Sequence, residues 1–180
     1  MEVTTTAIAG LLVIEPKLSG DARGFFYESF NQKRFHESTG LDVKFVQDNH
    51  SRSARRVLRG LHYQLQQPQG KLVRVVRGAV FDVALDIRKH SPTFGQWMGI
   101  ELTEDNRKQL WLPPGLAHGF MVVSDTADVL YKTTSYYKPE LERCIAWNDP
   151  ALAIQWPLNA DPILSPKDRM GLMLRDAELA

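Results

Sequence analysis

The chain has 180 residues, of which 43% are hydrophobic and 24% charged, as in an ordinary soluble globular protein. Lys and Arg number 22 and Asp and Glu 21, so the formal net charge is +1 and the attraction on which nucleic-acid binding depends is missing. No stretch approaches the ~20 apolar residues that span a bilayer, and the N-terminus lacks the basic region of a signal peptide. The single cysteine, Cys144, cannot form an internal disulfide. We therefore expect one cytoplasmic domain over residues 1–180, with neither a nucleic-acid nor a membrane partner.

The predicted elements are mostly short β-strands. A short helix is predicted over residues 31–38, ended by Gly40. The clearest strand is 79–87, where large apolar residues alternate with Val80, Asp82, Ala84 and Asp86, as in a half-buried strand. Shorter β-prone runs, separated by turns, cover residues 72–76, 97–102, 109–112, 119–123, 129–133 and 143–147. Many short strands at this spacing favour an antiparallel sandwich or barrel.

A second helix is predicted near the C-terminus. Ser165 can serve as its N-cap, Pro166 suits the first helical position, and Asp168 stands where the acid of a capping box would stand. Residues 172–174 would then supply an apolar face that docks on the barrel.

The densest polar cluster lies between residues 47 and 71. Strands normally disfavour so many Gln, Asn and Gly residues, so solvated loops are one interpretation of this region. In a barrel, however, Arg59, His62, Gln64 and Lys71 would point into one mouth, because they fall on two adjacent segments. Arg59 and Lys71 there suit a phosphate, the arginine through its fork and the lysine as a compact charge.

Further motifs make the chain resemble a known family. Pro113-x-Gly115-x-x-His118, by itself also typical of a tight turn, resembles the second signature of the cupins, small β-barrels of jelly-roll type. Motifs along nearly the whole chain resemble the dTDP-4-dehydrorhamnose 3,5-epimerase family: GDARGFF (20–26), FVQDN (45–49), LRGLHYQ (58–64), GKLVRVVRGAVFDVALDIR (70–88), SPTFGQW (91–97), LWLPPGLAHGF (110–120), YKTTSYY (131–137) and LSPKD (164–168). The resemblance implies a mainly all-β fold, an antiparallel jelly-roll barrel with a few short helices.

The same resemblance implies an isomerase that needs no cofactor. Members of the family invert C3 and C5 of dTDP-4-dehydro-6-deoxy-glucose and so produce dTDP-4-dehydro-rhamnose. Both carbons flank the C4 ketone, so removal of either proton leaves an enolate whose charge spreads onto oxygen. Epimerisation then needs a base on one face of the sugar, an acid on the other, and a fixed positive group beside the oxygen.

Four residues match the family's catalytic positions. His62 matches the base, Asp168 the carboxylate that orients it, Tyr131 the acid and Lys71 the residue that stabilises the enolate. Asp168 could instead only cap the C-terminal helix, because one carboxylate rotamer cannot readily do both. Tyr131 alone would more often be a packing residue, and Lys71 a solvated one.

Nine more residues match the family's substrate contacts: Arg23, Glu28, Gln47, Asn49, Arg59, His118, Tyr137, Glu142 and Lys167. The arginines suit the pyrophosphate and Tyr137 the thymine ring, although the adjacent Tyr136 could equally stack there. The chain has no glycine-rich phosphate loop, so side-chain cations are expected to hold the phosphates. In this family an N-terminal segment, which here would carry Arg23 and Glu28, crosses to the partner subunit, so a homodimer is predicted.

A metal site is not expected. Many cupins bind a metal through three histidines and a glutamate, whereas only His62 and His118 stand in matching motifs here, and Gln64 is a poor ligand. Three other functions remain open: a family member that acts at one carbon only, for another deoxysugar; a metal-dependent cupin enzyme; and a nucleotide-sugar binding module without catalysis.

Overall fold

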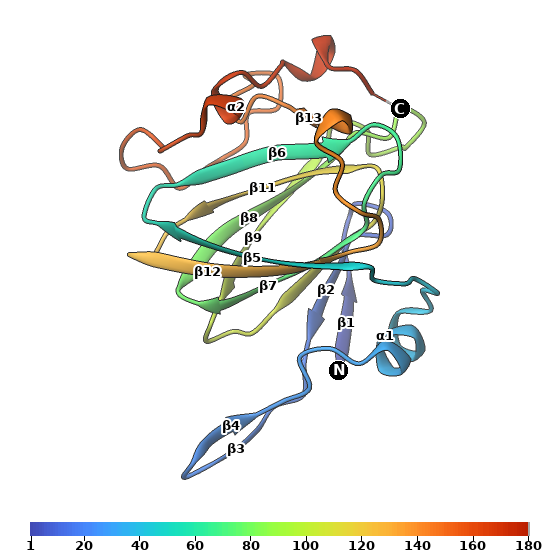
Figure 1. Cartoon of the computed structure of the whole chain (residues 1–180), viewed down its shortest axis with the longest axis vertical. Coiled ribbons are helices and arrows are strands. Elements are labelled where there is room, and N and C mark those ends of the chain that lie inside the picture. The colour runs from blue at the N-terminus through green and yellow to red at the C-terminus, as the bar shows by residue number, and fades with distance from the viewer. Residues whose placement is uncertain (180) are drawn as a thin grey trace.

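Two antiparallel sheets face each other and form a jelly-roll barrel in the computed structural model, which describes residues 1–179 (Figure 1). The six-stranded sheet has the order β1 (Glu2–Thr5), β2 (Leu12–Glu15), β10 (Gln109–Leu112), β7 (Lys71–Arg77), β12 (Thr126–Thr133) and β5 (Gln47–Ala54). The five-stranded sheet has the order β13 (Glu142–Cys144), β6 (Leu58–Gln64), β11 (Leu116–Val122), β8 (Ala79–Asp86) and β9 (Trp97–Thr103). The predicted all-β fold class is confirmed.

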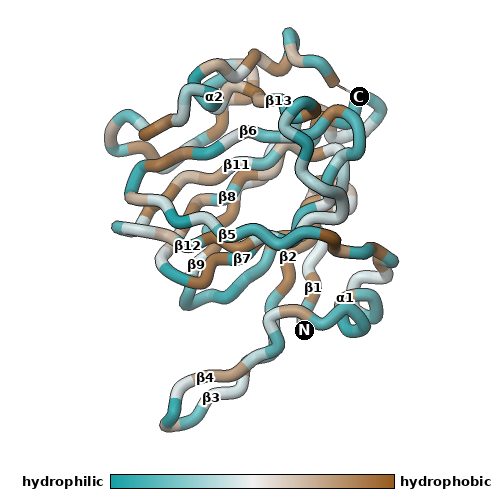
Figure 2. The backbone as a smooth tube through the Cα atoms, viewed as in Figure 1, coloured by the Kyte–Doolittle hydropathy of each residue, from teal (hydrophilic) through white to brown (hydrophobic). Residues whose placement is uncertain are grey.

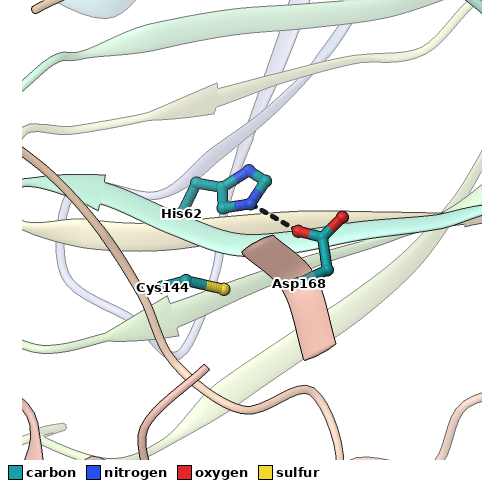
Figure 3. A group of neighbouring side chains, drawn as sticks. All are labelled: His62, Cys144 and Asp168. Atoms are coloured by element: carbon teal, nitrogen blue, oxygen red, sulfur yellow. Dashed lines mark hydrogen bonds and ion pairs between the residues drawn. The ribbon is translucent and has the colours of Figure 1, made fainter. Parts of the chain in front are cut away.

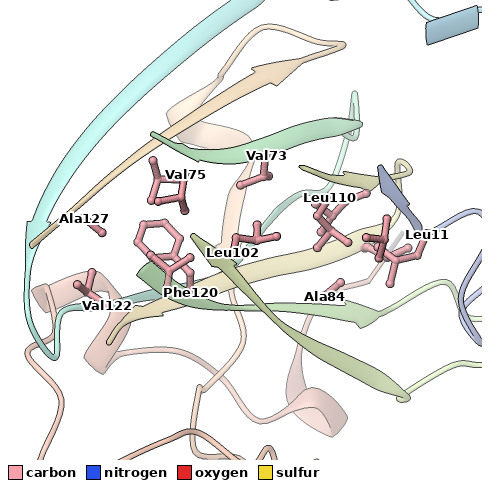
Figure 4. Packing of buried hydrophobic residues seen from close by; sticks show 14 of the residues in the cluster. Leu11, Val73, Val75, Ala84, Leu102, Leu110, Phe120, Val122 and Ala127 are labelled. Atoms are coloured by element: carbon pink, nitrogen blue, oxygen red, sulfur yellow. The ribbon is translucent and has the colours of Figure 1, made fainter. Parts of the chain in front are cut away.

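The main core fills the space between the two sheets. Val73 and Val75 of β7 meet Leu102 of β9 and Phe120 of β11, all at most 4% exposed (Figure 4). A second cluster covers the outer face of the five-stranded sheet, where Trp156 and other C-terminal residues pack. Burial on both faces stabilises this sheet, at about 25 cal/mol per Å² of apolar surface removed from water.

The predicted strand over residues 79–87 is confirmed as β8, but it is not half-buried, because both of its faces are covered. Asp82 and Asp86 have no exposed surface. Such carboxylates need partners. Asp82 contacts His118, while Asp86 accepts hydrogen bonds from the side chains of Arg88, Ser91 and Thr93. The acids that look like a solvent face in the sequence are therefore buried polar groups.

The polar region between residues 47 and 71 forms strands rather than loops. β5 and β6 are regular strands, and β5 pairs with β12 along its whole length. Figure 2 shows β5 as mostly hydrophilic, in contrast to β8 and β11. β5 lies at the edge of its sheet. Its side chains face a cavity on one side and solvent on the other. Gln and Asn are therefore not buried among apolar groups, and their usual penalty in a strand is removed.

Helix α1 (Gln32–Thr39) confirms the first helix prediction. The Asn31 side chain caps it by accepting a hydrogen bond from the Arg34 amide at 3.1 Å. Gly40 ends it with a φ of 72°, a left-handed conformation that favours glycine. Phe35 anchors the helix by packing against Trp111 of β10.

The second helix is much shorter than predicted. α2 (Pro166–Arg169) begins after the Ser165 cap and makes a single turn, followed by a short 3₁₀ segment at Leu174–Asp176 (η2). Residues 172–174 are not its apolar face, because Leu172 forms a β-bridge with Ile145. Another 3₁₀ turn, η1 (Pro139–Leu141), leads into β13.

The strand predictions locate β7 to β13 but miss β1 and β2 entirely, and some of the predicted ends differ from the observed ones. β11 begins at Leu116, three residues before its predicted start, and β13 ends at Cys144 rather than at residue 147. A hairpin of β3 (Ser19–Asp21) and β4 (Gly24–Phe26) was not predicted and extends away from the barrel (Figure 1). Among residues 1–179, no helix has the length and apolar character needed to cross a membrane.

Candidate active site

A cavity of about 320 Å³ opens between the two sheets, on the side where β5 and β6 lie. Ten of the thirteen residues predicted for the site line it: Gln47, Asn49, Arg59, His62, Lys71, His118, Tyr131, Tyr137, Glu142 and Lys167. They come from both sheets and from the segments around β13 and α2. The fold thus gathers into one cavity residues that lie up to 120 positions apart in the chain.

His62 is held by Asp168 at the edge of this cavity. The Nε2 atom of His62 lies 2.6 Å from Oδ1 of Asp168, which is only 3% exposed (Figure 3). Burial alone would raise the pKa of Asp168, but hydrogen bonds from His62, Ser165 and the Gly60 amide outweigh burial and lower that pKa to about 2. An ionised Asp168 accepts the Nε2 proton, which leaves Nδ1 of His62 free to accept another.

The Asp168 carboxylate contacts His62, and at the helix cap it accepts the Ser165 hydroxyl rather than the Ser165 amide that a capping box uses. Oδ1 contacts His62 and also accepts the Gly60 amide, at 3.1 Å. Oδ2 accepts the Ser165 hydroxyl at 2.6 Å, while the Asp168 amide donates back to that hydroxyl at 3.2 Å. The helix cap therefore fixes the carboxylate that holds the imidazole.

Tyr131 lies on β12, in the sheet that faces the one carrying His62. Its ring packs against the core between the sheets, and it lines the same cavity as His62. Burial raises the pKa of Tyr131, with a further contribution from Glu142. The phenol is therefore protonated at neutral pH and can act as a proton donor.

Lys71 begins β7 and is only 8% exposed. Its Nζ atom lies 3.5 Å from the carbonyl oxygen of His62. Burial lowers the pKa of Lys71 to about 8, although Glu142 and Asp82 act in the opposite direction. At pH 7 most of the side chain still carries its charge, as a poorly hydrated cation beside the cavity.

Replacing Lys71 by methionine should raise the free energy of unfolding at pH 7 by up to about 3 kcal/mol, since each unit of the fall in pKa from 10.5 to about 8 corresponds to ~1.4 kcal/mol. Below pH 8 the ammonium is charged in both the folded and unfolded states, and the burial cost is complete. Between pH 8 and 10.5 the folded state loses its proton first, so the wild type gains stability and the difference shrinks. Urea denaturation of both proteins at pH 7 and pH 10 measures this difference in the free energy of unfolding.

The control for this measurement is Lys33→Met, because the Lys33 side chain is 83% exposed. This substitution should change the free energy of unfolding by less than about 0.5 kcal/mol at either pH. A Lys71→Met protein less stable than the wild type at pH 7 would contradict the assigned burial cost.

Three polar side chains form a connected group at the rim of the cavity. Oε2 of Glu142 accepts the Tyr137 hydroxyl at 2.7 Å and the Lys167 ammonium at 2.6 Å. The hydrogen bond to Glu142 raises the pKa of Tyr137 to about 12. Tyr137 lines the cavity, whereas Tyr136 is not among its lining residues, so the geometry favours Tyr137 as the aromatic that meets a ligand.

His118 has a carboxylate partner that the sequence-based prediction missed. Its Nε2 atom lies 2.9 and 3.0 Å from the two oxygens of Asp82, and both residues are buried. His118 stands directly opposite His62 on the neighbouring strand. The presence of Asp82 in a strand that is otherwise apolar apart from Asp86 was the available signal.

Ser51, Gln69 and Phe120 also line the cavity and were not predicted. Ser51 follows Gln47 and Asn49 at spacings of two along β5, so strand periodicity identifies it once β5 is known to be a strand. Its Oγ atom is buried and has no hydrogen-bond partner within residues 1–179. Phe120 likewise follows His118 at a spacing of two along β11, so both side chains point to the same face of that strand.

Three predicted residues do not line this cavity: Asp168, which contacts His62 at its edge, and Arg23 and Glu28, which lie far from it. Arg23, at the tip of the β3–β4 hairpin, is paired with Asp21 at 2.6 Å and is exposed. Glu28 contacts Arg34 at 2.7 Å and Asn31 at 2.9 Å. Within one chain, the segment of residues 19–28, here called the N-terminal arm, thus lines no part of this cavity.

A second cavity, of about 440 Å³, adjoins the first and shares Gln69 and Lys71 with it. Its other lining residues are mainly apolar, and Arg88 among them is already paired with Asp86 in an ion pair. Lys71 lies on its wall, and so does Gln64, so the prediction that Gln64 points into the same mouth as His62 is wrong. The first cavity, where His62 and Tyr131 meet, is therefore the candidate active site, although it is the smaller one.

Comparison with known proteins gives a consistent result. The family model described as dTDP-4-dehydrorhamnose 3,5-epimerase matches residues 5–176. A protein of that name from Pseudomonas aeruginosa is 58% identical over 99% of this chain and 98% of its own. A Legionella pneumophila dTDP-6-deoxy-D-glucose-3,5-epimerase, solved in complex with dTDP-4-keto-L-rhamnose, superposes with a TM-score of 0.96 at 56% identity, over 98% of this chain and 94% of that one.

A more distant relative is named for a narrower activity. The dTDP-4-dehydrorhamnose 3-epimerase of Streptomyces niveus is 40% identical over 98% of this chain and 86% of its own. Family model, sequence identity and fold agree over almost the entire length. The chain belongs to the dTDP-4-dehydrorhamnose 3,5-epimerase family.

Proposed function

We propose that the protein inverts C3 and C5 of dTDP-4-dehydro-6-deoxy-D-glucose and so produces dTDP-4-dehydro-L-rhamnose, as an isomerase of dTDP-rhamnose biosynthesis. The observation that carries the proposal is the approach of His62 and Tyr131 to one cavity from opposite sheets. Family membership and the ligand of the Legionella relative support the substrate class. Inversion requires a base and an acid on opposite faces of the same carbon, and this arrangement supplies them.

His62 begins each inversion by removing the proton from the carbon next to the C4 ketone. Asp168 holds the Nε2 proton, so Nδ1 accepts the substrate proton and the ring becomes an imidazolium beside an ionised carboxylate. The electron pair of the broken C–H bond moves toward the C4 oxygen. That oxygen then carries the negative charge of an enolate.

Lys71 stabilises this enolate. Its ammonium is buried at the start of β7 and charged at neutral pH, so it meets the developing charge in an environment of low polarity. A cation fixed there before the reaction does not need to reorganise as the charge forms. The lowered pKa of Lys71 means that burial of the charged ammonium costs free energy. An anionic intermediate beside it offsets that cost.

Tyr131 completes the inversion by donating its phenolic proton to the opposite face of the carbon. The phenol becomes a phenolate, whose raised pKa favours rapid recovery of a proton. The imidazolium of His62 loses its proton to solvent, and Tyr131 takes one up, so the enzyme returns to its starting state. Each inversion therefore replaces one carbon-bound proton by one from water.

The remaining lining residues are proposed to bind the nucleotide sugar. Arg59 and Lys167 bring cations that suit the pyrophosphate, and the ring of Tyr137 suits the thymine base. Gln47, Asn49, Glu142 and His118 offer hydrogen bonds to the sugars, with His118 oriented by Asp82. Recognition then depends on side chains rather than on a phosphate-binding loop.

The N-terminal arm is proposed to complete the site of a partner subunit. The β3–β4 hairpin extends from the barrel with Phe25 and Phe26 59% and 73% exposed, and it carries Arg23 at its tip (Figure 1). Exposed aromatic rings beside an exposed arginine suit a surface that packs on another molecule. A homodimer that exchanges these arms would place Arg23 and Glu28 at each other's sites.

Co-expression of an Arg23→Ala chain with a His62→Asn chain tests this exchange. Mixed dimers would have one site with an intact barrel and an intact arm, so random pairing should restore about one quarter of wild-type turnover. At a substrate concentration far below the KM of the Arg23→Ala protein, each variant expressed alone should be nearly inactive. Turnover of the mixture no higher than the sum of the two single variants would contradict arm exchange.

Proton NMR of the product tests the reaction itself. The expected product from dTDP-4-dehydro-6-deoxy-D-glucose is inverted at both C3 and C5. A product inverted at one carbon alone would favour the narrower activity for which the Streptomyces relative is named. Unchanged sugar despite tight binding would favour a binding module, and near-stoichiometric iron, zinc or manganese required for turnover would favour a metal-dependent enzyme.

A further inference from the structure

Cys144 lies beside the His62–Asp168 pair, and the mechanism above does not use it. Cys144 stands directly opposite His62 in the pairing of β13 with β6. Its sulfur, Nε2 of His62 and a carboxylate oxygen of Asp168 all lie within 4.8 Å of one another. Figure 3 shows the three side chains converging from β13, β6 and α2.

We propose that His62, Cys144 and Asp168 form an inhibitory binding site for a thiophilic divalent cation such as Zn²⁺. Imidazole nitrogen, thiolate sulfur and carboxylate oxygen are the three donor types that zinc takes in proteins. A thiolate among the ligands disfavours Mg²⁺ and Ca²⁺, which prefer oxygen. Water would complete a four-coordinate site.

The side chains need only small movements to bind the ion. Zinc–ligand bonds of 2.0–2.3 Å in a tetrahedron place ligand atoms roughly 3.3–3.8 Å apart. The 2.6 Å contact between His62 and Asp168 would open by about 1 Å, and a sulfur at the 4.8 Å limit would close by about 1 Å. Since Ser165 and Gly60 hold the Asp168 carboxylate, the first shift is assigned to the His62 ring and the second to the Cys144 side chain.

The backbone around the site is already held in place. The Leu172 amide donates to the Cys144 carbonyl at 3.0 Å, and the Ala146 amide donates to the Leu172 carbonyl at 2.8 Å. These bonds tie the segment that follows α2 to the end of β13. The ligands of β13 and α2 are therefore close together before an ion arrives, which reduces the ordering cost of binding.

Binding would exchange protons for the ion. Burial raises the pKa of the Cys144 thiol to about 12, so without metal the thiol is protonated and a poor nucleophile. A coordinated thiol is deprotonated, and its proton leaves to solvent as the Zn–S bond forms. Nε2 of His62 must also release its proton to solvent, while Nδ1 takes one up so that the bound ring stays neutral; coordination then replaces the hydrogen bond to Asp168.

The inhibitory effect, unlike the binding itself, rests on the proposed function of His62. With the ion bound, the imidazole is no longer oriented by an Asp168 hydrogen bond and carries a positive charge beside it. Both changes oppose proton abstraction. Turnover should therefore fall in proportion to occupancy and return when a chelator removes the ion.

Direct binding is measured first, in the absence of substrate, because a pyrophosphate also binds zinc. Cobalt(II) titrated into the metal-free wild type should produce a thiolate-to-cobalt charge-transfer absorption that saturates at one ion per chain. Zinc titrated by calorimetry should show the same stoichiometry. Cys144→Ser should lose the charge-transfer band and weaken zinc binding by at least ~10-fold, the lower end of the cost of losing even an outer-sphere partner of a metal site.

Zinc inhibition of turnover is then compared among variants. Cys144→Ser should keep basal turnover and need at least ~10-fold more zinc for the same inhibition. His50→Ala is the matched control, because His50 lies 3.3 Å from Asp128 in a histidine–carboxylate pair on the surface, and its inhibition should equal that of the wild type. Cys144→Ala serves if the serine variant misfolds.

The outcomes separate the two proposals. Equal zinc affinity of wild type and Cys144→Ser, or loss of binding in His50→Ala, would overturn the metal site. A cobalt thiolate band without any inhibition would support the metal site and count against His62 as the base.

Discussion

His62→Asn is expected to lower kcat by at least ~10²–10⁴-fold, the contribution of one general base, while the affinity for dTDP stays close to that of the wild type. Asparagine keeps a polar side chain of similar reach but cannot accept a proton at neutral pH. The loss should appear in kcat rather than in KM, because the imidazole acts on the sugar carbon and not on the nucleotide. Stopped assays of sugar conversion, with calorimetric titration of dTDP, measure the two effects separately.

Arg59→Ala is the matched control for this experiment, since Arg59 lies on the same strand and lines the same cavity. Loss of a hydrogen bond to a charged group costs about 1.5–3 kcal/mol, so dTDP binding should weaken roughly 10- to 100-fold. If His62→Asn weakened dTDP binding as much as Arg59→Ala and left kcat unchanged, His62 would be a binding residue rather than the base.

Tyr131→Phe is expected to separate proton removal from inversion. Without the phenolic proton, the enolate formed by His62 can recover a proton only from the face that lost it, so the sugar returns to its starting configuration. In deuterated water, the recovered substrate should therefore gain deuterium while the inverted product falls by ~10²-fold or more. The substitution keeps the buried ring and should leave the fold intact.

Mass spectrometry and NMR of the recovered sugar check this separation. The wild type should show deuterium mainly in inverted product, and His62→Asn should show it in neither species. Inversion by Tyr131→Phe at the wild-type rate would remove Tyr131 from the mechanism and assign the proton delivery to another group or to water.

Much of the barrel was predictable from local patterns. The apolar runs that became β7, β9, β10 and β12 carry their own β signal, and Asn31 and Gly40 mark the ends of α1. Local patterns failed where tertiary contacts decide the structure. Leu172 leaves the helical path because the open edge of β13 accepts it, and no propensity within residues 165–174 indicates this pairing.

The residues of the site were predicted from sequence motifs, whereas some of the hydrogen bonds between them were not. His62, Tyr131 and Lys71 stand in recognisable segments, and all three reach one cavity. The partnership of His118 with Asp82 depends on the pairing of β11 with β8, which local sequence does not encode. In the same way, only the placement of α2 beside β6 shows that Asp168 serves the cap and the histidine together.

Proton exchange during a single turnover tests the central claim most directly. Wild-type enzyme in excess over dTDP-4-dehydro-6-deoxy-D-glucose, in deuterated water, should convert it to product with one deuterium at C3 and one at C5, each in the inverted configuration. This follows because His62 and Tyr131 act on opposite faces and both exchange protons with solvent. Inverted product that retains its original protons at both carbons would contradict the account.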